Sequence, residues 1–325
     1  MNFDIRKYVD KEITKKEAFN LCNLKGNDLL YLFAAADEVR NKYCGNVLEI
    51  CTITNAKSGK CSENCKFCAQ SVFYNTGVKS YPLKDKETLK KEFYEAYKNG
   101  STRFGIVTSG KSFEYGTYDF NVIIDFIKEI MSEKPEAEIC CSLGLLGEKE
   151  MSALKKAGAS RYHCNIQTSS EKYSVFAAST HSFEDRINTV KNAQKSGLQV
   201  CCGGIIGMGE TWEDRINMAF ALKELNPQGI PINILNPIKG TPLENRNFLS
   251  PEEVLKTIAI FRLILKDKNI KIAAGRESVF KDFMGSGFLS GANGMLTGGY
   301  LTVKGRNIED DSKFTKDIKN LWNNI

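Results

Sequence analysis

The feature that most constrains the fold is a regular alternation of strand-like and helix-like runs, which starts near residue 45 and continues almost to the end of the chain. This alternation is typical of stacked βα units around a parallel sheet. The eight candidate strands are NVLEICTI, STRFGIV, EICCSLG, RYHCNIQ, LQVCCGGII, IPINIL, IKIAAGR and ANGMLTG. Because no Pro- or Ser-rich linker interrupts the series, we expect an α/β fold with one TIM-type (β/α)8 barrel.

We expect residues 1–325 to form a single domain, with the barrel over 45–303, a helical extension over 1–40 and a tail over 304–325 that carries a C-terminal helix. Two kinds of signal support the helices between the strands. One is an apolar stripe at helical spacing, formed by Phe120, Ile123, Ile124, Ile127, Ile130 and Met131. The other is a set of helix starts, namely Ser182 with Asp185, Thr211 with Asp214, and SPEEV at 250–254.

Composition excludes several classes of protein. Apolar residues make up 42% and charged residues 26%, and no apolar run approaches the roughly 18 residues of a membrane span. The N-terminus lacks the apolar segment of a secretory signal, so we expect a cytoplasmic protein without a membrane partner. The net charge of +6 is not gathered into a basic stripe, so nucleic acid is not expected as a partner.

Eleven cysteines in a chain without an export signal point to metal or sulfur chemistry, because the cytosol keeps thiols reduced. Cys22, Cys44 and Cys51 lie scattered in apolar surroundings and are interpreted as small core residues. The other eight lie in or beside motifs.

Three of these eight form the loop CSENCKFCAQS, in which Cys61, Cys65 and Cys68 are spaced C-x-x-x-C-x-x-C. A structural zinc site normally has four protein ligands, and the fourth is missing locally. A four-iron cluster held by three thiolates leaves one iron open for another ligand. The spacing favours the cluster, and a zinc site completed by a distant cysteine such as Cys51 is the alternative.

Parallel barrels carry their chemistry at the carboxyl ends of the strands. Polar or sulfur-bearing residues recur at these ends, so several segments are expected to meet at one mouth. They are Lys57 with the Cys61 loop, Thr108, Ser109, Cys140, Asn165, Gln167, Cys201, Asn233, Arg276 and Thr302.

The cysteine loop after the first strand resembles that of the radical S-adenosylmethionine (SAM) enzymes, and CKFCAQS resembles biotin synthases in particular. The resemblance covers roughly residues 20 to 310 and includes NGSTRF, CCGGIIGMGET, PINILNPIKGTPL, AAGRE and SGAN. It implies a 4Fe-4S cluster on Cys61, Cys65 and Cys68, whose open iron binds SAM. Reductive cleavage of SAM then gives methionine and a 5′-deoxyadenosyl radical. This radical takes hydrogen from dethiobiotin, and sulfur closes the thiophane ring to form biotin.

The same resemblance implies roles for individual residues. Phe67 and the backbone of Ile205 would lie along the adenosine, and Arg186 would meet the methionine carboxylate. Asn165 would bridge SAM and dethiobiotin, and Gln167 stands where the family has an aspartate on the ribose, so it keeps an acceptor but loses a charge. Lys57, Asn233 and Thr302 match positions on the dethiobiotin side.

A second, auxiliary Fe-S cluster donates the sulfur in the family, held by three cysteines and an arginine. Cys140, Cys201 and Arg276 match three of these positions, but Gly105 stands where the first cysteine is expected. Cys141, Cys164 and Cys202 are extra thiols nearby, although strand alternation turns all three away from the barrel interior. We hypothesise an auxiliary cluster that is either 2Fe-2S or larger, as the resemblance to biotin synthases of anaerobes implies, and that uses Cys140, Cys201 and some of the extra thiols.

Two alternative functions stay open on the sequence. One is a related radical SAM maturase or mutase, and the other is a noncatalytic metal- or sulfur-binding module. Neither histidine has a partner pattern that indicates a general acid or base. The resemblance further implies a homodimer and a reducing protein such as flavodoxin or ferredoxin.

Overall fold

The computed structural model describes residues 5–303 and 305–323. Within them, nine parallel strand segments form one sheet that closes on itself, because β1 pairs with both β2 and β9, and β7 pairs with β5, β6 and β8. The strands are β1 (Glu49–Lys57), β2 (Arg103–Thr108), β3 (Ile139–Ser142), β4 (Arg161–His163), β5 (Gln199–Cys201), β6 (Gly204–Ile206), β7 (Gly229–Ile234), β8 (Asn269–Ile272) and β9 (Gly294–Thr297).

The predicted eight-stranded barrel is confirmed, with one predicted strand divided into β5 and β6. The division falls at Cys202 and Gly203. Here the backbone passes so close to β7 that a Cβ on Gly203 would lie 2.0 Å from the carbonyl oxygen of Pro231. Only glycine fits such an approach, and the strand breaks where it occurs.

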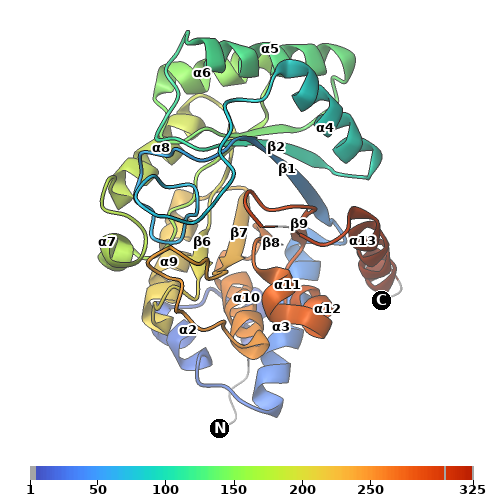
Figure 1. Ribbon diagram of the computed structural model, residues 1–325. Coiled ribbons are helices and arrows are strands. Elements are labelled where there is room, and N and C mark those ends of the chain that lie inside the picture. The colour runs from blue at the N-terminus through green and yellow to red at the C-terminus, as the bar shows by residue number, and fades with distance from the viewer. Residues whose placement is uncertain (1–4, 304, 324–325) are drawn as a thin grey trace.

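Helices surround the sheet on its outer side (Figure 1). They are α1 (Lys7–Asp10), α2 (Lys15–Leu21), α3 (Asn27–Cys44), α4 (Lys86–Lys98), α5 (Tyr118–Glu133), α6 (Glu148–Ala157), α7 (Tyr173–Phe176), α8 (Phe183–Lys195), α9 (Trp212–Leu225), α10 (Pro251–Leu265), α11 (Arg276–Phe280), α12 (Met284–Leu289) and α13 (Ile308–Asn323), with short 3-10 turns at Ser170–Lys172 and Lys281–Phe283. The expected N-terminal helices and C-terminal helix are present, while residues 1–4, 304 and 324–325 of the predicted extension and tail lie outside the described residues.

The predicted helix starts form as expected. Ser182 and Thr211 each accept a hydrogen bond from the backbone N–H three residues later, and the aspartates at those positions complete capping boxes at the starts of α8 and α9. Ser250 caps α10, with Pro251 in its first turn. No described helix is long and apolar enough to cross a membrane.

The barrel interior is hollow, which sets it apart from a barrel filled by branched side chains. A cavity of about 410 Å³ lies inside it. Small residues that line it, among them Gly105 on β2, Ser142 on β3 and Ala273 just after β8, leave this space free. The strands therefore bring distant parts of the sequence to one site inside the barrel.

Candidate active site

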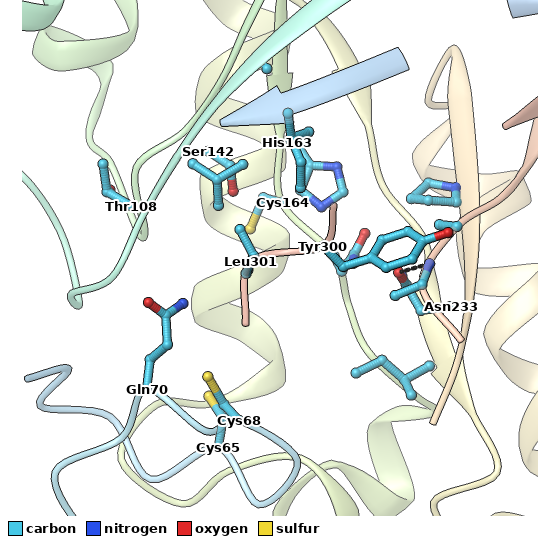
Figure 2. A pocket seen from close by; sticks show the side chains of 18 of the residues that line it. Cys65, Cys68, Gln70, Thr108, Ser142, His163, Cys164, Asn233, Tyr300 and Leu301 are labelled. Carbon is cyan, nitrogen blue, oxygen red and sulfur yellow. Dashed lines mark hydrogen bonds between the residues drawn. The ribbon is translucent and has the colours of Figure 1, made fainter. Parts of the chain in front are cut away.

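Cys61, Cys65 and Cys68 lie on the loop that follows β1, and all three line the cavity. Figure 2 shows the sulfur atoms of Cys65 and Cys68 pointing into the cavity. Backbone hydrogen bonds hold the loop in shape: the Cys61 N–H donates to the Gln70 carbonyl at 2.9 Å, and the Cys68 N–H donates to the Cys65 carbonyl at 3.0 Å. One short segment thus presents three thiols to the same space.

The chemistry of this trio fits an iron–sulfur cluster. Burial raises the pKa of Cys65 to about 12 and that of Cys68 to about 11, so both are neutral thiols in the metal-free protein. Iron binding removes these protons and relieves the cost of burying the sulfur atoms as thiolates. No group of three His, Cys, Asp or Glu side chains among the described residues is placed to hold a single metal ion.

The cysteine loop is fixed to α8 through a chain of polar contacts. Glu63, between Cys61 and Cys65, lies 2.5 Å from His181 Nδ1, and His181 Nε2 lies 2.9 Å from Arg186 Nη2. Burial, followed by the nearby Arg186, lowers the pKa of His181, so the ring is neutral at pH 7. The hydrogen-bond network then assigns the proton to Nδ1, which donates to Glu63, while Nε2 accepts from Arg186.

The residues expected along the adenosine are brought together. Phe67 packs with Ile205 in one apolar cluster, and Asn165, Gln167 and Arg186 line the same cavity. The Gln167 side-chain oxygen is buried without a hydrogen-bond partner, which is costly unless a ligand supplies the donor. This orphaned acceptor indicates that the cavity is built for a polar ligand.

Cys164 faces the cavity, against the prediction from strand alternation. β4 ends at His163, so the alternation of side chains no longer applies at the next residue. Cys164 lines the cavity (Figure 2). Its sulfur accepts a hydrogen bond from Arg186 Nη1 at 3.8 Å, and the next residue, Asn165, lines the same cavity. Cys141 packs in the apolar core and also contributes to the lining, whereas Cys202 is fully buried in that core and is not among the described lining residues.

A second group of residues lies deeper in the cavity, toward the amino ends of the strands, whereas the cysteine loop follows the carboxyl end of β1. The sequence analysis did not single out most of these residues as site residues. We call this group the floor; with Cys140 and Cys201 it contains Glu49, Cys51, Arg103, Arg161 and Lys271. Glu49 accepts from Arg161 and Arg103, at 2.8 Å each, and also pairs with Lys271. The sequence did hold a signal for this group: a charged residue stands within a short strand run, as Lys271 does in IKI and Arg161 in RYH.

Cys51 belongs to the floor, which overturns its interpretation as an isolated core residue. Its sulfur lies 3.2 Å from Lys271 Nζ, and the same ammonium lies 3.8 Å from the sulfur of Cys201. Burial raises the pKa of Cys51 to about 12. Burial also acts to raise the pKa of Cys201, but Lys271 and a hydrogen bond with His163 outweigh it and bring that pKa to about 6.

Arg276 does not reach the floor, so its predicted role at the auxiliary cluster is wrong. β8 ends at Ile272, and Arg276 is the first residue of α11. Its guanidinium is fully buried and donates to Asp311 and to the Tyr300 hydroxyl, at 2.6 Å each. Arg276 therefore anchors Tyr300, which lines the cavity, and Lys271 is the cation that β8 directs inward.

Of the residues expected near dethiobiotin, Asn233 and Thr302 line the cavity and Lys57 does not belong to the described lining. The β1–β2 register shifts between Asn55 and Lys57, and this irregularity turns Lys57 away. Its ammonium instead pairs with Asp119 of α5 at 3.0 Å. Asn233 keeps its amide oriented by donating to the Gly204 carbonyl at 3.1 Å.

Comparison with known protein families agrees with this geometry. The Radical SAM superfamily matches residues 56–222, which include the cysteine loop and α8. The Biotin and Thiamin Synthesis associated domain matches residues 231–319, which include β8, β9 and most of α13. Both matched segments supply strands to the one closed sheet.

Curated relatives decide the family. Biotin synthases from Acetivibrio thermocellus and Carboxydothermus hydrogenoformans are 49% and 45% identical to the chain, over 92% and 94% of each sequence. The biotin synthase from Thermotoga neapolitana is 51% identical over 84% of this chain and 97% of its own. The chain belongs to the biotin synthase family.

Solved structures share the fold of this biotin synthase family member at low sequence identity. A methylornithine synthase superposes with a TM-score of 0.81 at 20% identity, over 97% of this chain and 96% of that one. A maturase of the [FeFe]-hydrogenase gives 0.81 at 18% identity, over 97% of this chain and 73% of that one. These likenesses show that the closed barrel with its surrounding helices is shared.

Membership in the biotin synthase family makes the chain an enzyme that uses a 4Fe-4S cluster, SAM and an auxiliary Fe-S cluster. The described cysteines form two groups of thiols, one on the loop and one on the floor, so that there is one group for each cluster. All eleven cysteines are free of disulfide bonds, so none of these thiols is committed elsewhere.

Proposed function

We propose that this chain converts dethiobiotin to biotin by radical SAM sulfur insertion, in which two C–H bonds of the substrate are replaced by two C–S bonds to one sulfur. The observation that carries the proposal is the joint opening of three loop thiols and the floor thiols into one cavity. When bound, the 4Fe-4S cluster would supply one electron for each SAM that is split into methionine and a 5′-deoxyadenosyl radical, with one SAM used for each of the two C–H bonds, and the auxiliary cluster would supply the sulfur.

On this proposal, Cys61, Cys65 and Cys68 hold the 4Fe-4S cluster, and Arg186 binds the methionine carboxylate of SAM. A guanidinium suits this task because its parallel N–H groups match two carboxylate oxygens. Tyr173 and His181 hold the Arg186 side chain from two directions, at 3.1 Å and 2.9 Å. The arginine is thus oriented before SAM arrives, which lowers the cost of ordering it on binding.

The middle of the cavity is assigned to the adenosine and the substrate. Phe67 and Ile205 offer an apolar surface for the adenine, and the unpaired Gln167 oxygen offers an acceptor for a ribose hydroxyl. Asn165, held by the Gly203 N–H at 2.9 Å, lies where it can contact both ligands, and Asn233 and Thr302 serve dethiobiotin. Tyr300 and Leu301 line the same cavity and exclude water from a reactive radical.

Three further features complete the proposal. The electron comes from a reducing protein of the flavodoxin or ferredoxin type, and the enzyme is a homodimer, as the family resemblance implies. Its free cysteines suit the reducing cytoplasm.

The test is anaerobic reconstitution with iron and sulfide, followed by incubation with SAM, dethiobiotin and dithionite. We expect biotin together with 5′-deoxyadenosine whose formation depends on dethiobiotin. Iron-replete protein that releases no 5′-deoxyadenosine under any reductant would contradict the radical SAM assignment. Release of 5′-deoxyadenosine that is indifferent to dethiobiotin, with no biotin, would point to a related maturase or mutase.

A further inference from the structure

The floor contains thiols from three strands, although Gly105 occupies the position on β2 where the family resemblance implies a cysteine. Gly105 pairs with Ile53 of β1 on one side and with Cys140 of β3 on the other. A Cβ at position 105 would lie 3.0 Å from the Ile53 side chain, closer than an ordinary carbon–carbon contact. Ile53 thus crowds the space in which a thiol from β2 would have to lie.

Cys51 offers the missing thiol from the neighbouring strand. It precedes Ile53 by two residues, so both side chains point into the barrel, and both line the cavity. Lys271 Nζ lies 3.2 Å from the Cys51 sulfur and 3.8 Å from the Cys201 sulfur, which places these two sulfurs around one ammonium group. Cys140 lines the same cavity as Cys51 and Cys201 and interacts electrostatically with both.

The charges of the floor favour an anionic occupant. Three cations, on Arg103, Arg161 and Lys271, surround the single carboxylate of Glu49. Arg103 has a second partner in Glu138, the residue just before β3. Among the ion pairs of the described residues, Arg161 and Lys271 each have Glu49 as their one partner. Buried positive charge without a counter-charge is costly, and an iron–sulfur cluster held by three thiolates keeps a net negative charge after its iron is counted, which would offset part of that cost.

Glycine makes this convergence possible on the far side of the barrel. A Cβ on Gly229 of β7 would meet Arg161 Nη1 and the Cys201 sulfur at 3.3 Å each, and Lys271 Cε at 3.4 Å. All three side chains therefore close in over a position that carries no side chain of its own. The floor is built to bring two cations and the Cys201 thiol together at this point.

The other cysteines are less well placed. Cys202 follows Cys201 in the chain but is buried in the apolar core, and Cys141 packs in the same core beside Cys140. Cys164 faces the cavity, yet its sulfur is hydrogen-bonded to Arg186, the residue proposed for SAM. Cys51 is the remaining thiol with direct contacts on the floor.

We propose that Cys51, Cys140 and Cys201 are the protein thiolates that hold the auxiliary iron–sulfur cluster, with Cys51 in place of the cysteine absent at position 105 and Lys271 as a hydrogen-bond donor to the bound sulfur atoms. This inference rests on the proposed function for the existence of the cluster, but it concerns only the ligands. It assigns to the floor a ligand set drawn from β1, β3 and β5.

The test compares Cys51→Ala with a control variant, Cys202→Ala. Cys202 is a buried cysteine that does not belong to the described lining of the cavity. Both proteins are reconstituted anaerobically, checked for a cooperative thermal unfolding transition, and analysed for iron, sulfide and Mössbauer signals. We expect Cys51→Ala to lose the auxiliary iron and its Mössbauer component while it keeps the loop cluster. Cys202→Ala should match the unsubstituted protein. Full auxiliary iron in Cys51→Ala would overturn the inference.

A second measurement covers the case in which Cys51→Ala does not fold. Anomalous scattering at the iron edge, in anaerobic crystals of the unsubstituted holoenzyme, should place iron within bonding distance of the Cys51, Cys140 and Cys201 sulfurs. Iron bonded to Cys140 and Cys201 but not to Cys51 would overturn the ligand set. A protein with both clusters that forms no 5′-deoxyadenosine would instead refute the proposed function and leave this ligand set standing.

Discussion

At the mouth of the cavity, three cysteines come from eight consecutive residues, 61–68, whereas at the floor three cysteines come from positions 51, 140 and 201 on separate strands. The mouth has its thiols on a single loop shaped by its own backbone hydrogen bonds. The floor has no local motif and depends on barrel closure and on the ion pairs of Glu49. The comparison teaches that a site made by one loop is visible in the sequence, while a site made by strand register is visible only after folding.

The largest expected effect separates the two regions by chemistry. Cys65→Ala should abolish 5′-deoxyadenosine formation, because the loop cluster loses one of its three ligands, while the iron of the floor remains. Cys140→Ala should instead keep 5′-deoxyadenosine formation and the loop cluster, but lose biotin formation. Product analysis by chromatography and iron analysis check both variants, with Cys22→Ala, a core cysteine, as the control. Equal loss of both products in both variants would show that the regions do not act separately.

Next in size is Lys271→Met, which removes the ammonium shared by Cys51, Cys201 and Glu49. A group that orients metal ligands typically contributes about 10–100-fold in metal affinity or activity, and we expect a loss of that order in auxiliary-cluster binding. Iron titration followed by Mössbauer spectroscopy measures the loss. Lys271→Arg is the matched control, since it keeps the charge, and it should retain most of the cluster. Undiminished iron binding in Lys271→Met would remove Lys271 from the floor's function.

His181→Ala tests how the mouth positions SAM. His181 accepts from Arg186 at 2.9 Å, and hydrogen bonds to charged groups contribute about 1.5–3 kcal/mol. We therefore expect the KM for SAM to rise about tenfold or more, with kcat changed far less, because Arg186 itself remains. His181→Gln, which can still accept from Arg186, should recover part of the affinity. A fall in kcat at constant KM would contradict a positioning role.

The smallest expected effect is a gain from Gln167→Asp. The unpaired Gln167 oxygen becomes a charged acceptor, and its backbone at φ 70° is a conformation that Asp tolerates. A charge-assisted hydrogen bond is roughly twice as strong as a neutral one, which amounts to about 1 kcal/mol or roughly fivefold tighter SAM binding. Equilibrium measurements of SAM binding check this gain. The control is Gln167→Asn, whose side chain is as short as that of Asp but neutral, and it should show no gain. Weaker binding by Gln167→Asp would argue against a ribose contact.

Much of the fold was predictable because its signals are local. Eight strand-like runs, the apolar stripe of α5 and the caps at Ser182, Thr211 and Ser250 each depend on residues within one or two helical turns. The predicted positions of side chains were wrong where a strand ended before the run of residues from which it was predicted. Alternation was carried past His163 to Cys164, and the candidate strand IKIAAGR was extended past Ile272 to Arg276. In both places the chain had already left the sheet.

The sequence by itself determined the parallel barrel, the three-cysteine loop and the absence of a cysteine at position 105, since each of these is written in consecutive residues or in a short period. Only the tertiary structure decided that Cys51 and Lys271 meet Cys140 and Cys201, that Arg276 lies elsewhere, and that Lys57 turns to Asp119. The physical reason is strand register: which side chains share a level inside a closed sheet depends on pairing between strands far apart in the chain, and no single segment encodes that pairing.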